Sequence, residues 1–226
     1  MKRDNEMNNR DFLNYCQLAF INGISDAMAV IILHKVFVVL VTGNIIFLIT
    51  DMAVHFEFKD WVRLSLLANF ILSEIVVHRT LAQKTIHFRI SLAIFFIVTY
   101  CITGILATNS HNIDANSWGF FIVANIAAIA SVTINNIFYR FHTTKFNLVA
   151  YTMNLLNLIH MLMDKKYSDA KVLGITFFCF IMGLLVASFM VVKWSFFTVL
   201  IIIPILINLY ITNRNQFKLT ENTSKT

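Results

Sequence analysis

Long apolar segments separated by short polar clusters dominate this sequence. A helix that crosses a bilayer needs about 20 mostly apolar residues, because each residue advances it by about 1.5 Å. Eight segments of roughly that length lie at 13–33, 36–54, 62–80, 88–107, 118–139, 146–163, 172–192 and 194–212. The pattern predicts an all-α polytopic membrane protein.

The composition supports this prediction. Of the 226 residues, 58% are hydrophobic and 13% are charged, whereas a soluble domain usually has about 25% charged residues. So little charge cannot cover a water-facing surface of ordinary make-up. It excludes a soluble enzyme, a disordered tail and a disulfide-rich secreted domain, and it makes the lipid bilayer the first expected partner.

The basic residues form short clusters between the apolar segments, and the net charge is +6. Such clusters are typical of cytoplasmic loops. If 36–54 and 146–163 are re-entrant, six transmembrane helices place nearly every basic cluster in the cytoplasm, together with both termini. The sequence leaves open whether these two segments cross or re-enter. The clusters form no basic stripe, which argues against nucleic acid as a partner, and the sequence leaves a homo-oligomer open.

A weak internal repeat relates the two halves of the chain at an offset of 110 residues, where Thr42 matches Thr152 and Asn44 matches Asn154. Three crossings in each half is an odd number, so the halves would be inverted, as in many secondary transporters. Chance similarity between apolar stretches is the alternative. The expected organisation is a cytoplasmic N-terminal tail (1–11), a first half (12–107), an external linker (108–117), a second half (118–212) and a polar C-terminal tail (213–226).

Two acidic side chains, Asp26 and Glu74, lie within apolar segments. A carboxylate at the centre of a membrane helix costs about 2.5–3.5 kcal/mol unless it is protonated, paired or in a wet cavity. The repeat places Asn136 opposite Asp26. We therefore predict that Asp26, Glu74 and Asn136 contribute to a site for a proton, a cation or another ligand. Buried hydrogen bonds between helices are the alternative.

The sequence Thr42-Gly43-Asn44 lies near the middle of segment 36–54. A re-entrant segment must turn within the membrane, and the backbone groups freed by the turn need partners. Gly43 would permit the turn, while Thr42 and Asn44 would bind the freed groups or a ligand. Thr152 and Asn154 are expected to play the same part in the second half. An ordinary helix with small residues at a packing interface is the alternative.

Five further asparagines are expected to mix interhelical hydrogen bonds with cavity lining, and the sequence does not separate the two roles. They are Asn22, Asn69, Asn125, Asn135 and Asn208. No Ser/His/Asp, P-loop or metal-ligand spacing stands out, and the three cysteines are isolated. The expectation is a protein that is not an enzyme, with no catalytic residues, no cofactor and no metal.

The stretch Gly23-x-x-Asp26-Ala27 and the Thr-Gly-Asn sequence that follows it at 42–44 resemble the YoaK-like family of small bacterial inner-membrane proteins (domain of unknown function 1275). The resemblance extends over about residues 12–212, and in the second half the motifs depart from the family pattern. It implies a location in the bacterial inner membrane and supplies no activity.

The repeat, the buried carboxylates and the glycine in 36–54 together favour one function. We expect a small secondary transporter or permease for an unidentified small molecule or ion, with its site near the midplane between the two halves. Transport coupled to protons is one form that this function can take. The alternative is a non-transporting membrane scaffold or assembly protein, in which the polar residues only pack helices.

Overall fold

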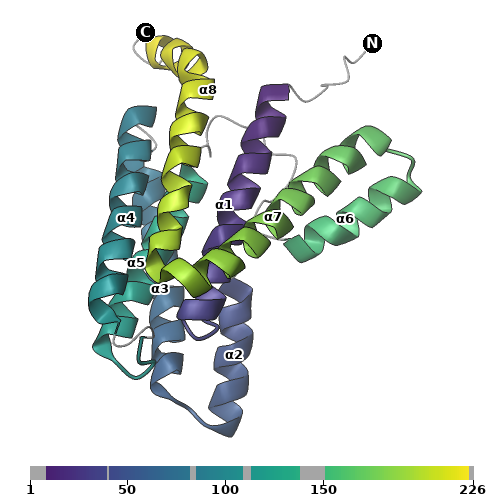
Figure 1. Cartoon of the computed structure of the whole chain (residues 1–226). Helices are drawn as coiled ribbons and strands as arrows, with labels where there is room; N and C mark the ends of the chain where they lie inside the picture. The colour runs from purple at the N-terminus through teal and green to yellow at the C-terminus, as the bar shows by residue number, and fades with distance from the viewer. Residues whose placement is uncertain (1–8, 40, 82–84, 109–112, 138–150, 224–226) are drawn as a thin grey trace.

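The computed structural model describes residues 9–39, 41–81, 85–108, 113–137 and 151–223. Within these ranges all regular structure is helical and no strand occurs. The elements, labelled in Figure 1, are α1 (Asn9–Ile32), α2 (Val41–Val54), α3 (Phe58–Leu81), α4 (Ile86–Ala107), α5 (Trp118–Asn136), α6 (Tyr151–Met163), α7 (Tyr167–Trp194), the 3-10 helix η1 (Ser195–Ile201) and α8 (Ile202–Thr223). The prediction of an all-helical chain is confirmed.

Four segments of the described chain are long and apolar enough to cross a membrane. They are Phe12–Ile32, His87–Ala107, Trp118–Asn136 and Tyr167–Asn213. This is the make-up of a helical membrane protein. The described part of α3 has the length but not the apolar character, because Asp60, Arg63 and Glu74 lie within it.

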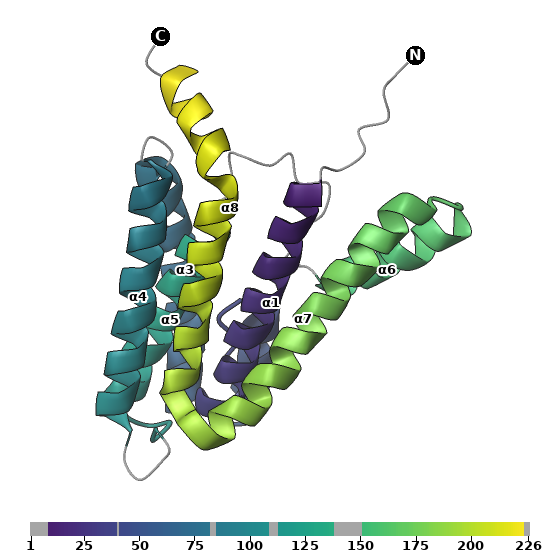
Figure 2. The same cartoon turned by 45° about the horizontal axis from the view of Figure 1, so that its top comes forward.

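The described parts of α2 and α6 are much shorter than the other α-helices. With 14 and 13 residues, at about 1.5 Å per residue, they extend about 20 Å, against a hydrocarbon core of about 30 Å. In Figure 1, α2 lies below α1, at the end of the molecule away from the chain termini. Helix α6 lies beside the half of α7 that is nearer to the termini. The N and C labels lie at the same end of the molecule in both views (Figures 1 and 2).

Helices α7 and α8 diverge from η1, and α1 lies between them (Figure 2). The closest approach is between α1 and α7 at Gly23 and Gly183, whose Cα atoms are so near that a Cβ on Gly183 would lie 3.2 Å from the Cα of Gly23. Such a Cβ would also overlap the carbonyl oxygen of Phe20. Only glycine allows the two backbones this contact, which is a common way for membrane helices to pack.

Helices α1 and α8 are joined at the end of the molecule where the termini lie. Asn14 on α1 and Asn213 on α8 exchange two side-chain hydrogen bonds of 2.9 Å, and each residue is buried. The first and last helices of the chain are therefore fastened by a reciprocal amide pair.

Two boundaries differ from the sequence prediction. Segment 36–54 was expected to have its break near 42–44, but α1 ends at Ile32, the chain reverses through His34 and Lys35 with φ of 50° and 63°, and α2 begins at Val41. The polar tail predicted from 213 is helical as far as Thr223, so α8 extends beyond the apolar segment 194–212. Hydropathy locates apolar stretches, but it does not register helical turns that continue past them.

Candidate polar site between α1, α3 and α5

A group of buried amides connects α1 with α5. Asn22 on α1 donates from Nδ2 to Oδ1 of Asn135 on α5 at 3.2 Å. Asn135 in turn donates to the carbonyl oxygen of Ser131, one turn earlier on α5, at 3.1 Å. Asn22 is 1% exposed. A buried amide is stable only when its groups are hydrogen-bonded, so this pair fixes the two helices against each other.

The next residue of α5, Asn136, faces α3. Its Nδ2 donates to Oε2 of Glu74 at 2.8 Å and to the carbonyl oxygen of Val132 at 3.0 Å. A hydrogen bond to a carboxylate is stronger than one between neutral groups. Two of the residues predicted from the sequence, Glu74 and Asn136, are thus brought into direct contact.

Asp26 lies one helical turn after Asn22, on the same face of α1. It is 2% exposed. Asn135 and Asn136 are neighbours on α5, and they bind Asn22 on α1 and Glu74 on α3, respectively. The polar site is defined here as Asn22, Asp26, Glu74, Asn135 and Asn136. Each of its two carboxylates can hold a proton, and its amides can donate hydrogen bonds.

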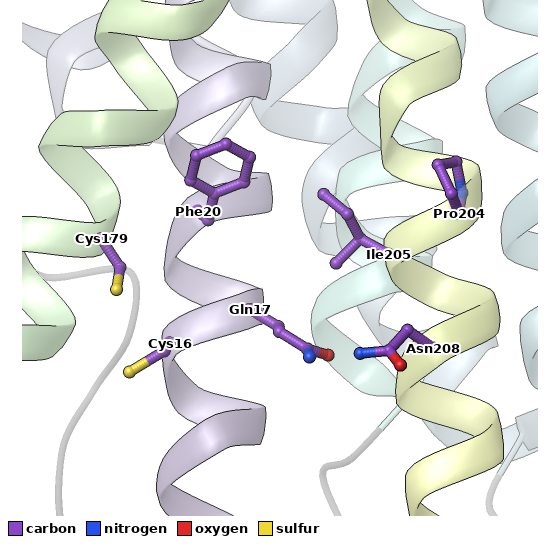
Figure 3. Close-up of a pocket in the computed structure, with 7 residues that line it drawn as sticks. All are labelled: Cys16, Gln17, Phe20, Cys179, Pro204, Ile205 and Asn208. Atoms are coloured by element: carbon purple, nitrogen blue, oxygen red, sulfur yellow. The ribbon is translucent and has the colours of Figure 1, made fainter.

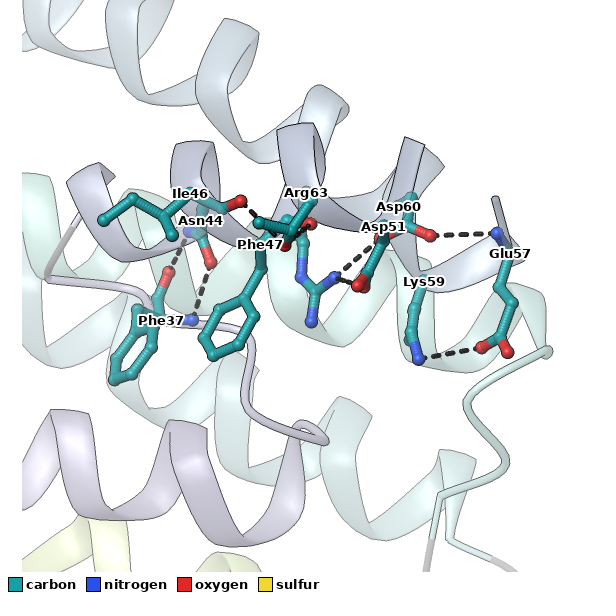
Figure 4. A network of polar contacts seen from close by, with 10 residues as sticks. Phe37, Asn44, Ile46, Phe47, Asp51, Glu57, Lys59, Asp60 and Arg63 are labelled. Atoms are coloured by element: carbon teal, nitrogen blue, oxygen red, sulfur yellow. Dashed lines mark hydrogen bonds and ion pairs between the residues drawn. The ribbon is translucent and has the colours of Figure 1, made fainter. Parts of the chain in front are cut away.

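Asn44 does not belong to this site, because both ends of its amide bind the backbone of Phe37. Oδ1 accepts from the Phe37 amide N at 2.9 Å, and Nδ2 donates to the Phe37 carbonyl oxygen at 2.5 Å (Figure 4). The side chain holds the extended stretch before α2 against the first turn of that helix. The structure supports the backbone role that the sequence allowed for Asn44.

Gly43 and Thr42 have other roles than the turn predicted for them. Both lie in the first turn of α2, and no described glycine has a positive φ. A Cβ on Gly43 would lie 2.7 Å from Cδ2 of Phe37, so the glycine makes room for this ring. Thr42 is exposed. The turn within segment 36–54 is thus absent at Gly43, which lies in an ordinary helical turn, as the alternative prediction had it. The reversal at His34 and Lys35 lies in the gap between the predicted segments 13–33 and 36–54.

Thr152 and Asn154 lie in the first turn of α6. Their side chains are outside the described part of the structure. Within that part, no three His, Cys, Asp or Glu side chains gather to hold a metal ion.

A second set of amides joins α3 to α5 beside the polar site. Asn69 on α3 donates to Oδ1 and to the carbonyl oxygen of Asn125 on α5, both at 3.0 Å. Asn125 donates to Oγ of Ser65 at 3.1 Å, and Ser73 donates to Oδ1 of Asn69 at 3.0 Å. The structure thereby separates roles that the sequence could not: Asn22, Asn69, Asn125 and Asn135 are interhelical, whereas Asn208 lines a groove described below.

Sequence reasoning missed an ionic cluster that joins the end of α2 to the start of α3. Nη1 of Arg63 lies 2.6 Å from Oδ2 of Asp51 and 2.6 Å from Oδ1 of Asp60, and its guanidinium lies over the ring of Phe47 (Figure 4). Asp60 also accepts from the amide N of Glu57 at 2.9 Å, as an acidic residue in a first helical turn commonly does. The sequence signal that could have found the cluster is the spacing of three residues between Asp60 and Arg63, which brings opposite charges together on a helix.

This cluster lies outside the four apolar segments and has clear electrostatic consequences. The hydrogen bond from Arg63 lowers the pKa of Asp51 below its ordinary 3.8. In the adjoining turn, the hydrogen bond and charge of Lys59, 2.9 Å away, lower the pKa of Glu57. Glu57 likewise raises the pKa of Lys59. Both carboxylates therefore carry their charge at neutral pH, and the cluster closes the α2–α3 hairpin.

A family model described as a protein of unknown function (DUF1275) matches residues 15–212. The chain belongs to this family. The match extends from α1 into α8 and includes all the residues of the polar site, so the resemblance seen in the sequence is confirmed. No curated protein and no solved structure matches the chain. Membership of DUF1275 carries no activity with it.

Proposed function

We propose that this DUF1275 protein is a small secondary transporter or permease for a small molecule or ion, built from six crossing helices in two inverted halves. In this proposal Asp26, with Glu74 and Asn136, binds the proton or cation that couples transport. Both termini face the cytoplasm of a bacterial inner membrane. The observation that carries the proposal is the buried polar site that joins α1 and α3 of one half to α5 of the other.

The helix boundaries support two related halves. Helices α3 and α4 begin at residues 58 and 86, and α7 and η1 begin at 167 and 195, which is 109 positions later in each case. Under this correspondence α1 matches α5, α2 matches α6, α3 matches α7, and α4 matches η1 with α8. The starts of these elements therefore support the repeat, at an offset within one residue of that given by the matched side chains.

The packing supports the same correspondence. Helix α1 packs on α7, and its counterpart α5 packs on α3; α2 packs on α3, and α6 packs on α7. The α1–α7 contact in one half therefore corresponds to the α5–α3 contact in the other, and the α2–α3 contact corresponds to the α6–α7 contact. Helix α2 lies at the end of the molecule away from the termini, whereas α6 lies at its side along α7 (Figure 1).

Six crossings follow if the 47-residue segment Tyr167–Asn213 crosses twice, as its turn at η1 allows (Figure 2), and if α3 also crosses. Helix α3 has 24 residues, enough for about 36 Å. A carboxylate that faces lipid would be energetically costly, but Glu74 faces Asn136 of α5. Intramembrane carboxylates that face the interior of a helix bundle commonly mark proton or ion pathways.

A liposome flux assay with the full-length protein tests this proposal. Vesicles would carry a pH-sensitive dye, and candidate metabolites and monovalent cations would be added outside. We expect one class to drive a flux that Asp26→Asn and Glu74→Gln each reduce at least about tenfold, the effect of losing about 1.4 kcal/mol of binding or coupling free energy. Asp114→Asn, an exposed residue between α4 and α5, is the matched control and should leave the flux unchanged.

Size-exclusion chromatography of each variant in detergent keeps the result interpretable. A variant that elutes as the wild type but retains its flux removes the role given to that carboxylate. The absence of a protein-dependent flux for every class of solute contradicts the transport proposal itself.

One observation favours the second candidate, a membrane scaffold. Asn44, expected at a transport site, binds only the backbone of Phe37 among the described residues. A scaffold requires such polar groups to pack helices and nothing more. It predicts that Asn44→Leu lowers the melting temperature in detergent while no variant of the polar site changes a flux. Thr42→Val, at an exposed position of the same turn, is its control.

A further inference from the structure

A groove of about 430 Å³ opens between α1, α7 and α8 (Figure 3). This volume is within the range of small-molecule sites, about 300–1,000 Å³. Its lining residues are Cys16, Gln17 and Phe20 of α1, Cys179 of α7, and Pro204, Ile205 and Asn208 of α8. The groove lies on the part of α1 that precedes Asp26, toward the end of the molecule where the termini lie.

The lining has a distinct chemistry. None of its side chains is acidic or basic, and the polar groups are two carboxamides and two thiols. Gln17 and Asn208 point toward each other from opposite walls (Figure 3). Oε1 of Gln17 is buried and accepts no hydrogen bond from any residue in the described ranges. A buried amide oxygen favours any ligand that brings it a donor.

The corresponding place in the other half is built differently. There the helices are α5, α3 and α4, and the amide on α5, Asn125, is satisfied by Asn69 and Ser65 of α3. The helix bundle can therefore saturate its own amides at such a junction. At the groove, by contrast, Oε1 of Gln17 has no hydrogen bond from the described residues, and the side chain faces Asn208 (Figure 3).

We propose that this groove binds a small, neutral, mostly apolar molecule that carries a hydrogen-bond donor, and that this is the class of substrate the protein transports. Gln17 accepts the donor, Asn208 contacts the same polar group from α8, and Phe20 and Ile205 bury the apolar part. An ionic ligand would leave its charge in an uncharged groove without a partner. The assignment of a substrate class rests on the proposed transport function, whereas the binding itself does not.

The chain carries its own reporters for a test. Cys16 and Cys179 line the groove and are half-buried, and Cys101 on α4 lies outside it and is buried. All three are free thiols. Occupation of the groove should slow alkylation of the first two and leave the third unchanged.

The full-length protein in nanodiscs is treated with N-ethylmaleimide, and the rate at each cysteine is followed by mass spectrometry. Three probes of similar shape compete: 4-phenylbutanol, its anionic counterpart 4-phenylbutyrate, and butylbenzene, which has no donor. At about twice its Kd, 4-phenylbutanol should slow Cys16 and Cys179 about threefold. The other two probes should have little effect, and Gln17→Leu should abolish the protection.

Equal protection by butylbenzene, or protection that survives Gln17→Leu, would show a groove that accepts any apolar chain, such as a lipid tail, and would overturn the proposal. Protection by 4-phenylbutyrate alone, or by no probe, would overturn it as well. Protection by the alcohol without any flux in liposomes supports the binding site and contradicts transport. An Asp26-dependent flux of an ionic solute without protection supports transport and contradicts this inference.

Discussion

Two helix junctions, α1 with α7 and α5 with α3, correspond to each other in the proposed repeat, yet they are built from different chemistry. At the first, Gly23 and Gly183 bring the backbones into contact. At the second, Asn69 and Asn125 connect the helices through amides, and Glu74 binds Asn136 further along both helices. One junction depends on the absence of side chains, and the other depends on particular polar ones.

This difference has a physical consequence. A backbone contact between glycines is lost as soon as any atom is inserted, so it exists only where Gly23 and Gly183 meet. Interhelical hydrogen bonds impose a register, and breaking one leaves a buried polar group without its partner. The α1–α7 junction, which borders the groove, therefore depends on close packing, whereas the α3–α5 junction depends on specific hydrogen bonds.

The largest expected effect comes from adding one methyl group at the glycine junction. Gly183→Ala places a Cβ onto the carbonyl oxygen of Phe20, and relieving this overlap should cost about 1–3 kcal/mol of stability. Gly174→Ala in the same helix is the matched control, because its Cβ would meet only Leu158, at 3.8 Å. Thermal unfolding in detergent measures both. Equal melting temperatures for the two variants would mean that the glycine contact does not limit stability.

A smaller effect is expected at the amide junction, where only hydrogen bonds are lost. Asn125→Leu leaves Asn69 and Ser65 without their partner and should cost about 1 kcal/mol, the usual scale for a hydrogen bond between membrane helices. The double variant Asn69→Leu/Asn125→Leu should cost less than the sum of the two single variants, since it leaves fewer orphaned groups. Strict additivity would contradict the pairing. Asn116→Ala, at an exposed loop position, is the control.

The smallest effect is a pH dependence of stability from the ion pair at the N-terminal end of α3. Because Arg63 lowers the pKa of Asp51 below 3.8, the ion pair stabilises the α2–α3 hairpin fully above the unfolded pKa. This stabilisation is lost as the pH falls through the folded value, so the melting temperature should decrease below about pH 4. Asp51→Asn should reduce this decrease, and Asp114→Asn should not. A wild-type profile identical to that of Asp51→Asn down to pH 3 would show that the ion pair adds nothing.

Sequence alone predicted most of the fold, because a membrane helix is specified by a local property, the length of an apolar run. Each of the eight runs contains or overlaps a described helix. The boundaries were less well predicted. The gap between segments 13–33 and 36–54 gave the place of the reversal at His34 and Lys35, but not its positive φ. Residues other than glycine rarely adopt positive φ and are not marked by composition.

The candidate site was predicted in part. The cost of charge in a membrane singled out Asp26 and Glu74, and the repeat singled out Asn136, whose contact with Glu74 follows from packing. The role of Asn44 was open, since an amide suits a ligand and a backbone equally well. The groove could not be foreseen, because its residues come from three helices and share no spacing. Such a site exists only once α7 and α8 diverge.

The reciprocal bond between Asn14 and Asn213 also bears on biogenesis. The two asparagines are 199 residues apart, so at about 5–20 residues per second the ribosome needs about 10–40 s to supply the second after the first. During that time α1 is in the membrane without α8. Helix α1 therefore gains its hydrogen bonds to α8 only after α8 has been synthesised. A chain that stops before Asn213 would present to quality-control proteases an α1 in which Asn14 lacks this partner.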